Sequence, residues 1–188
     1  MKDLTPLLER TVCGDRQAYA AVVQHFQRPL AGFLTRMGLS PARVEDLAQD
    51  TFVKAWLHLD EYRPERAQFS TWLFTVARRL ALNELSRASS QRETPMGDDT
   101  PEPACAGAGP PMVLARQRRQ RQLQAALRLL PTEDRSVLAL AYVHELDLTE
   151  IARIEGVRPG TVRTRLYRAR QRLRDALGPD LESVDEDF

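Results

Sequence analysis

The sequence predicts an all-α protein made of two small helical domains that a flexible linker joins. Apolar residues recur at helical spacing on both sides of a central segment, and neither sustained β-branched alternation nor an Asn-Gly hairpin signal occurs. The central segment, residues 89–111, is rich in proline and glycine and poor in residues that could build a core. Because prolines interrupt a continuous helix, we expect this segment to separate two domains.

The chain has 188 residues, a length that suits one or two domains. We predict a first domain over 1–88, the linker over 89–111, a second domain over 112–178 and an acidic tail over 179–188. The alternative, a long loop inside one domain, is weaker because structureless loops of this length are uncommon. The tail carries five acidic residues and no basic residue, so we expect it to be disordered.

The two domains are predicted to contain eight helices. Pro131, followed by Thr132 and two acidic residues, is typical of a helix start because acids favour the first turn. Pro29 could introduce a break in the second helix. The expected helices cover residues 3–13, 15–37, 41–59, 70–88, 112–130, 132–144, 148–155 and 161–177.

The sharpest local signal lies between residues 147 and 177. Asp147, followed three residues later by Glu150, predicts a capping box at the start of a short helix. Residues 156–160, with glycine at both ends and Pro159 between them, predict a tight turn before the next helix. A short helix, a glycine-containing turn and a second helix form a helix-turn-helix.

The helix predicted over 161–177 has an apolar face and a basic face. We expect its inward residues to be Val162, Leu166, Ala169, Leu173 and Ala176. Six arginines against one aspartate give this helix a net charge of +5. A helix fits the DNA major groove, where its first residues reach base edges and flanking arginines meet phosphates. We assign base contact to Arg163, Thr164, Tyr167 and Arg168, and phosphate contact to Arg165, Arg170 and Arg172. The alternative is an ordinary solvated basic face.

A second informative stretch runs from residue 45 to residue 59. Its apolar stripe contains Ala48, Phe52, Ala55 and Leu59, with Trp56 at the edge. The opposite side carries Asp46, Gln49, Asp50, Val53 and Leu57. Acidic and amide groups beside two apolar side chains predict a protein-docking patch that attracts a basic partner. The alternative is a partly exposed amphipathic helix.

Arginines and aromatic residues are interleaved between residues 60 and 87. The arginines are Arg63, Arg66, Arg78, Arg79 and Arg87, and the aromatic residues are Tyr62, Phe69, Trp72 and Phe74. This combination suits single-stranded DNA, because charges follow the backbone and rings stack on unpaired bases. The alternative is that Phe69 and at least one of Trp72 and Phe74 belong to the core.

Composition narrows the class of protein further. The 27 basic and 26 acidic residues give a net charge of +1, which argues against a uniformly basic nucleic-acid coat but permits local patches. No apolar run reaches the ~20 residues of a membrane helix, and the N-terminus lacks a signal-peptide core. Cys13 and Cys105 have no metal-ligand spacing, and the three histidines form no catalytic motif. We therefore expect a cytoplasmic protein without membrane insertion, metal, cofactor or catalytic activity.

Several of these stretches resemble conserved regions of the bacterial sigma-70 family. Residues 46–56 (Asp-Leu-Ala-Gln-Asp-Thr-Phe-Val-Lys-Ala-Trp) resemble region 2.2, and residues 69–79 resemble regions 2.3 and 2.4. Leu130-Pro131, Arg135, residues 150–152, residues 160–163 and residues 168–170 resemble region 4. Two such domains with a short linker resemble the extracytoplasmic-function (ECF, group 4) RNA polymerase sigma factors.

The resemblance implies a role for each stretch. The docking patch would bind the β′ coiled coil of RNA polymerase core, and region 4 would contact the β flap. The loop over 60–68 would help to capture an unpaired base of the −10 element, which exposes the edge of that base for reading. The −10 set implied in this way is Arg63, Arg66, Trp72, Arg78, Arg79, Asn83 and Arg87. The helix over 161–177 would read the −35 element as duplex.

This chain departs from the family pattern at two positions of that set. Arg79 stands where the family often has Asn, and Asn83 stands where it often has Asp. Both differences raise the local basicity, so they bear on how the −10 element is handled.

The resemblance also implies control by an anti-sigma factor, which buries the polymerase-binding surfaces and can sequester such a protein at the membrane. The alternative function is a stand-alone helix-turn-helix transcriptional regulator, such as a two-domain response regulator. That alternative needs an N-terminal βαβ receiver domain, whereas residues 1–87 have an all-helical pattern.

Overall fold

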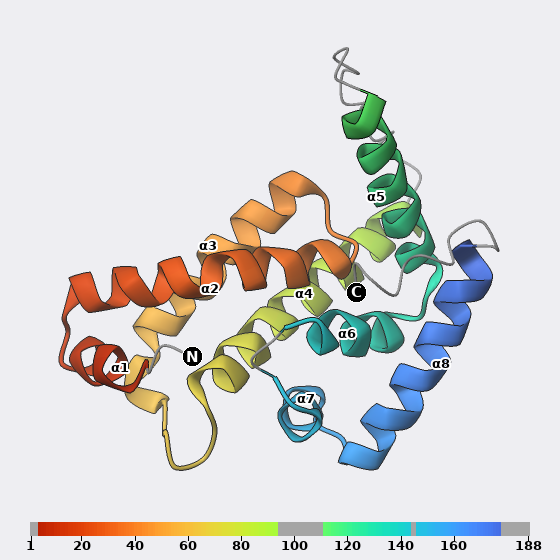
Figure 1. The fold of residues 1–188 in the computed structure, drawn as a ribbon. Helices are drawn as coiled ribbons and strands as arrows, with labels where there is room; N and C mark the ends of the chain where they lie inside the picture. Colours follow the sequence, from red (N-terminus) through yellow and green to blue (C-terminus); the bar gives the residue numbers. More distant parts are fainter. Residues whose placement is uncertain (1–3, 94–110, 144–145, 178–188) are drawn as a thin grey trace.

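The computed structural model describes residues 4–93, 111–143 and 146–177, and the regular elements in these ranges are all helical (Figure 1). The prediction of an all-α fold is confirmed. Among the described helices, none has a stretch with the length and hydropathy needed to cross a bilayer. The elements are α1 (Thr5–Val12), α2 (Arg16–Arg36), α3 (Pro41–Leu57), the 3-10 turn η1 (Leu59–Glu61), α4 (Phe69–Glu93), α5 (Pro111–Leu129), α6 (Thr132–Ala141), α7 (Leu148–Glu155) and α8 (Pro159–Leu177).

Several helix limits differ from the predicted ones by one to five residues, and three helices show informative features. Helix α2 continues through Pro29, because the fully buried Leu30 and Phe33 on the same helix favour one unbroken packed element over the lost hydrogen bond. Helix α4 extends to Glu93, into the segment predicted as linker. Helix α8 already begins at Pro159, since proline suits the first position of a helix. The rest of the predicted linker, and the tail, lie outside the described residues.

The N-terminal half is held together by aromatic side chains between α2, α3 and α4. The ring of Phe33 on α2 meets the ring of Phe74 on α4 edge to face, with centroids 5.6 Å apart, and both side chains are fully buried. The hydroxyl of Tyr19 on α2 donates a hydrogen bond to the backbone oxygen of Phe52 on α3. Burial raises the pKa of Tyr19 to about 12, so this hydroxyl keeps its proton, and can donate the bond, into alkaline solution.

The C-terminal half contains the predicted helix-turn-helix. The carboxylate of Asp147 accepts hydrogen bonds from the backbone nitrogens of Thr149 and Glu150, and Glu150 accepts one from the backbone nitrogen of Asp147. The predicted capping box is therefore confirmed. Gly156 ends α7 with φ of +68°, a left-handed conformation that allows the sharp turn into α8. Of the residues of α8 predicted to point inward, all are buried except Ala176, which is exposed near the end of the helix.

The two halves pack directly against each other. Helix α4 lies between the N-terminal helices and α7, and α6 lies near the end of α2 (Figure 1). Arg135 on α6 donates from Nη1 to the backbone oxygen of Met37, at 2.9 Å. Its Nη2 donates to the backbone oxygens of Arg128 and Leu130. Burial lowers the pKa of the Arg135 guanidinium, and the neighbouring charge of Arg128 lowers it further.

Gly38 permits this close approach. Its φ is +87°, which other residues rarely adopt, and a Cβ at this position would lie 2.7 Å from Nη1 of Arg135. A side chain at position 38 would therefore meet both a backbone penalty and the guanidinium. The contact between the halves depends on this glycine as well as on Arg135.

Replacement of Phe33 tests the packing of the N-terminal core. Phe33→Ala removes a fully buried ring and is expected to lower the free energy of unfolding by about 3–5 kcal/mol. Val12→Ala, at a side chain that is 56% exposed, should change it by less than about 0.5 kcal/mol. Chemical denaturation followed by circular dichroism measures both, and equal losses would contradict this core.

Candidate polymerase-binding and DNA-binding surfaces

One side of α3 forms an exposed surface that we call the α3 face. Val53 and Leu57, one helical turn apart, expose 57% and 66% of their area, so they form a small apolar spot in water. Two carboxylates and an amide extend this spot along the helix. The structure brings all five predicted residues to this one side: Asp46, Gln49, Asp50, Val53 and Leu57.

The opposite side of α3 holds this face in place. Its apolar residues Val44, Leu47, Phe52 and Ala55 are buried against the core. Arg43 lies at the edge, with Nη1 3.7 Å from a carboxylate oxygen of Asp46 and Nε 3.0 Å from one of Glu84 on α4. The orientation of the α3 face is therefore set by core packing on one side and by an ionic link to α4 on the other.

The predicted −10 residues fall into two groups. Arg63 and Arg66 in the loop before α4 are exposed, and so are Arg79, Asn83 and Arg87, which follow one another at four-residue spacing along α4. Trp72 is half-buried, whereas only 16% of the Arg78 side chain is exposed. Six of the seven predicted residues thus present a polar or aromatic group to solvent, while Arg78 faces another helix.

The aromatic residues of this region have mainly structural partners. The rings of Tyr62, Phe69 and Trp72 contact one another, with centroids 5.4–5.7 Å apart, where the loop joins α4. Phe69 and Phe74 are buried, so the expectation that they could stack on DNA is wrong and the alternative, a core role, is confirmed for both. Tyr62 and Trp72 remain accessible at the edge of this cluster.

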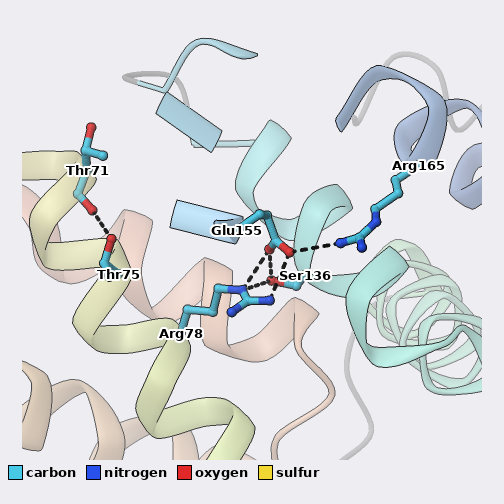
Figure 2. A network of polar contacts seen from close by, with 6 residues as sticks. All are labelled: Thr71, Thr75, Arg78, Ser136, Glu155 and Arg165. Carbon is cyan, nitrogen blue, oxygen red and sulfur yellow. Dashed lines mark hydrogen bonds and ion pairs between the residues drawn. The ribbon is translucent and has the colours of Figure 1, made fainter. Parts of the chain in front are cut away.

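Arg78 belongs to a polar network that we call the Glu155 cluster (Figure 2). Its Nε and Nη2 lie 2.8 and 2.9 Å from the two carboxylate oxygens of Glu155 at the end of α7. Ser136 on α6 donates to the same carboxylate at 2.5 Å, and Nη1 of Arg165 on α8 lies 3.5 Å from it. The Glu155 side chain is fully buried, so its charge is compensated entirely by these groups from both halves.

A second contact lies two helical turns away on the same side of α4. The hydroxyl of Thr71 donates to a carboxylate oxygen of Glu150 at 3.0 Å, and Glu150 is also the capping residue of α7. Sequence reasoning did not single out Thr71, Ser136 or Glu155 as functional residues. One signal was available, because an acid in the last turn of a helix lies at the negative end of the helix dipole and so calls for a cationic partner.

Helix α8 presents most of its predicted −35 residues to solvent. Tyr167 exposes 67% of its area, and the hydroxyl of Thr164 donates to the backbone oxygen of Gly160. Two of the predicted residues contact carboxylates instead: Arg165 contacts Glu155, and Arg172 pairs with Asp134 on α6. Six members of the set are exposed, and Arg165 is half-buried; the exposed members are Arg163, Thr164, Tyr167, Arg168, Arg170 and Arg172.

Comparisons with known proteins agree with this arrangement. The family model for sigma-70 region 2 matches residues 22–91, and that for sigma-70 region 4 matches residues 120–173. The RNA polymerase sigma-H factor of Pseudomonas aeruginosa is 30% identical over 187 residues, which cover 95% of each chain. The ECF RNA polymerase sigma factor RpoE of Cereibacter sphaeroides is 30% identical over 166 residues, 85% of this chain and 86% of that protein.

The chain therefore belongs to the sigma-70 family of RNA polymerase sigma factors, which are regulatory proteins. Within that family it is an ECF sigma factor, as its two matched regions and its similarity to named ECF factors show. The alternative of a response regulator has no support, because the described part of residues 1–87 contains no strand.

Two solved structures share the fold over most of the chain. CnrH in complex with the cytosolic domain of CnrY has a TM-score of 0.65 at 24% identity and covers 89% of this chain and 92% of that one. The sigma factor RpoE of Bartonella quintana, in complex with the anti-sigma factor NepR, has a TM-score of 0.66 at 23% identity, covering 86% and 98%. Both support the all-helical architecture described above.

Arg170 and Arg172, two residues apart on α8, allow a comparison of an exposed arginine with one that pairs with a carboxylate. Arg172→Ala removes the partner of the Asp134 carboxylate, whose side chain is 10% exposed, and should lower the free energy of unfolding by about 1 kcal/mol. Arg170→Ala should leave it within about 0.5 kcal/mol of the wild type. Thermal or urea unfolding measures both, and an unchanged stability of Arg172→Ala would contradict the structural role.

Proposed function

We propose that this sigma factor binds RNA polymerase core through the α3 face and directs it to promoters through two DNA-reading surfaces. The observation that carries the proposal is the segregation of exposed charge. The α3 face is acidic and apolar, whereas the exposed charged side chains assigned to DNA on α4 and α8 are arginines. Opposite signs on separate surfaces suit one protein partner and one DNA partner at the same time.

The α3 face has the chemistry of a protein interface. An exposed apolar pair supplies area that is buried on binding, and the surrounding carboxylates favour a basic partner and the correct orientation. We infer that its partner is the β′ coiled coil of RNA polymerase core. The region 4 half would contact the β flap.

The loop over 60–68 and helix α4 form the proposed −10 surface. Exposed arginines at 63, 66, 79 and 87 would follow the phosphates, and the aromatic edge at Tyr62 and Trp72 would meet unpaired bases. A base captured outside the stack can be read on its hydrogen-bonding edge. Arg78 joins this surface only after it leaves Glu155.

Helix α8 forms the proposed −35 surface. In a helix-turn-helix, the second helix enters the major groove with its first residues toward the bases, and the first helix crosses the backbone. The exposed Arg163, Thr164, Tyr167 and Arg168 lie in the first half of α8 and would reach base edges. Arg165, Arg170 and Arg172 would contact phosphates. The boundaries that go with this assignment are 1–88, 89–111, 112–178 and 179–188.

Control by an anti-sigma factor is part of the proposal. Two solved structures of similar fold are complexes, one with the cytosolic domain of CnrY and one with the anti-sigma factor NepR. A comparable partner would cover the α3 face of this chain, hold it away from polymerase and, where that partner is membrane-bound, sequester it at the membrane. The sigma factor itself would act in the cytoplasm and catalyse no reaction.

A charge reversal on the α3 face tests polymerase binding. Asp50→Arg replaces an exposed carboxylate with a cation and should reduce binding to core polymerase at least about 100-fold, since like charges then meet at the interface. Glu9→Arg, an identical charge change on exposed α1, should bind as the wild type does. Binding by fluorescence anisotropy and promoter-directed transcription with purified core are the measurements. Undiminished binding by a folded Asp50→Arg protein would refute the assignment.

Substitution of Arg168 tests how α8 meets DNA. Arg168→Ala should weaken binding to a −35 duplex by about 1–3 kcal/mol and relax the sequence preference, because it removes a base contact. Arg16→Ala, which removes the same charge from exposed residues of α2, should change neither. Titrations of matched and mismatched duplexes at several salt concentrations measure this. A uniform loss across sequences with a smaller salt slope would instead mark Arg168 as a phosphate contact.

A further inference from the structure

Two arginines assigned to different promoter elements meet at a single carboxylate. Arg78, from the −10 surface, lies 2.8–2.9 Å from Glu155, and Arg165, from the −35 helix, lies 3.5 Å from it (Figure 2). The −35 and −10 elements are centred about 25 base pairs apart, which is roughly 85 Å along B-form DNA. The two surfaces cannot reach their separate elements while both contact Glu155.

We propose that Glu155 is an autoinhibitory clamp, whose carboxylate occupies Arg78 and Arg165 in place of DNA phosphates and keeps the free protein closed until it engages polymerase. This proposal rests on the proposed function for the identity of the two DNA surfaces. The clamp itself is defined by contacts between α4, α6, α7 and α8.

The chemistry of the cluster suits this role. A carboxylate matches the planar fork of a guanidinium through two parallel hydrogen bonds, as a phosphate does, so Glu155 and DNA compete for the same donors of Arg78. The Glu155 side chain is fully buried, so dissolved salt screens this pair less than it screens exposed pairs. Removal of the cationic partner from a buried carboxylate raises the free energy, and this penalty favours the closed arrangement. The penalty ends once the halves separate and water reaches the carboxylate.

Other contacts between the halves fix the closed arrangement as a specific one. Thr71, on the same side of α4 as Arg78, donates to Glu150 on α7, and Arg135 on α6 donates to the backbone oxygen of Met37. The guanidinium of Arg36 lies over the ring of Tyr142, 5.5 Å from its centroid. The first of these contacts joins α4 to α7, and the other two join the end of α2 to α6 and its C-cap. Glu155 is the point of this interface at which two arginines assigned to DNA are neutralised.

The closed arrangement still leaves the α3 face open. All five of its residues are exposed while Glu155 holds Arg78, so polymerase can dock before the halves separate. Separation then frees Arg78 for the −10 strand and Arg165 for the −35 duplex. The clamp therefore places polymerase binding before engagement of both promoter elements.

The opening equilibrium of the full chain tests the clamp without DNA. Donor and acceptor dyes are attached to the exposed Cys13 and to an Ala176→Cys substitution on α8, in a Cys105→Ser background. Energy transfer is recorded across urea concentrations below the unfolding transition, so that opening is measured even where the closed form predominates. Glu155→Gln should shift the equilibrium about 10- to 100-fold toward the open form, the range expected when hydrogen bonds to charged groups are lost.

Two further variants make the result specific. Glu133→Gln, an equal charge change at an exposed position of α6, should retain the wild-type equilibrium. Arg78→Gln removes the other side of the pair without altering the C-terminal half, and should open the protein to a similar extent as Glu155→Gln. The double variant should open no further than either single variant, because both remove the same interaction.

The outcomes separate the clamp from the proposed function. If folded Glu155→Gln and Arg78→Gln proteins keep the wild-type equilibrium, the clamp is overturned, even if promoter-directed transcription is intact. Additive opening in the double variant also overturns it. If both single variants open the protein but no variant binds promoter DNA, the closing contact at Glu155 is supported, whereas its competition with DNA and the DNA-reading proposal both fail.

Discussion

The arrangement of the two halves depends on the compensation of one buried charge. Glu155 ends α7, where the helix dipole disfavours an acid, and its side chain has no contact with solvent. While it is buried, the carboxylate therefore depends on Arg78, Ser136 and Arg165 for compensation of its charge. Because these groups come from three other helices, the electrostatic requirement of one side chain fixes how α4, α6, α7 and α8 lie together.

Exposed charges of opposite sign lie on different surfaces of the molecule. The apolar sides of α3 and α8 are buried in the cores of their own halves, which leaves an acidic face on one helix and a basic face on the other. The near-neutral net charge of +1 is the sum of these opposite surfaces, and it conceals both. A formal charge calculated for the whole chain is therefore a poor guide to whether such a protein binds DNA.

Local patterns predicted those features that depend on residues close in sequence. Helical periodicity was enough to separate the exposed side of α3 from its buried side, and the spacing of Asp147 and Glu150 was enough to predict the capping box. The course of α2 through Pro29 depends on core packing that a local rule does not include. The partners of Arg78 and Arg172 are 77 and 38 residues away in the chain, so no periodicity on their own helices indicates them.

Gly38 has a consequence for how the molecule tolerates change. The residue lies outside both aromatic packing and the exposed faces, and its role is to let Arg135 reach the end of α2. A substitution there would act on the joint between the halves, while the core around Phe33 and Phe74 would keep its contacts. A change at this one position in a short turn would therefore shift the balance between compact and extended forms without altering a residue of either recognition surface.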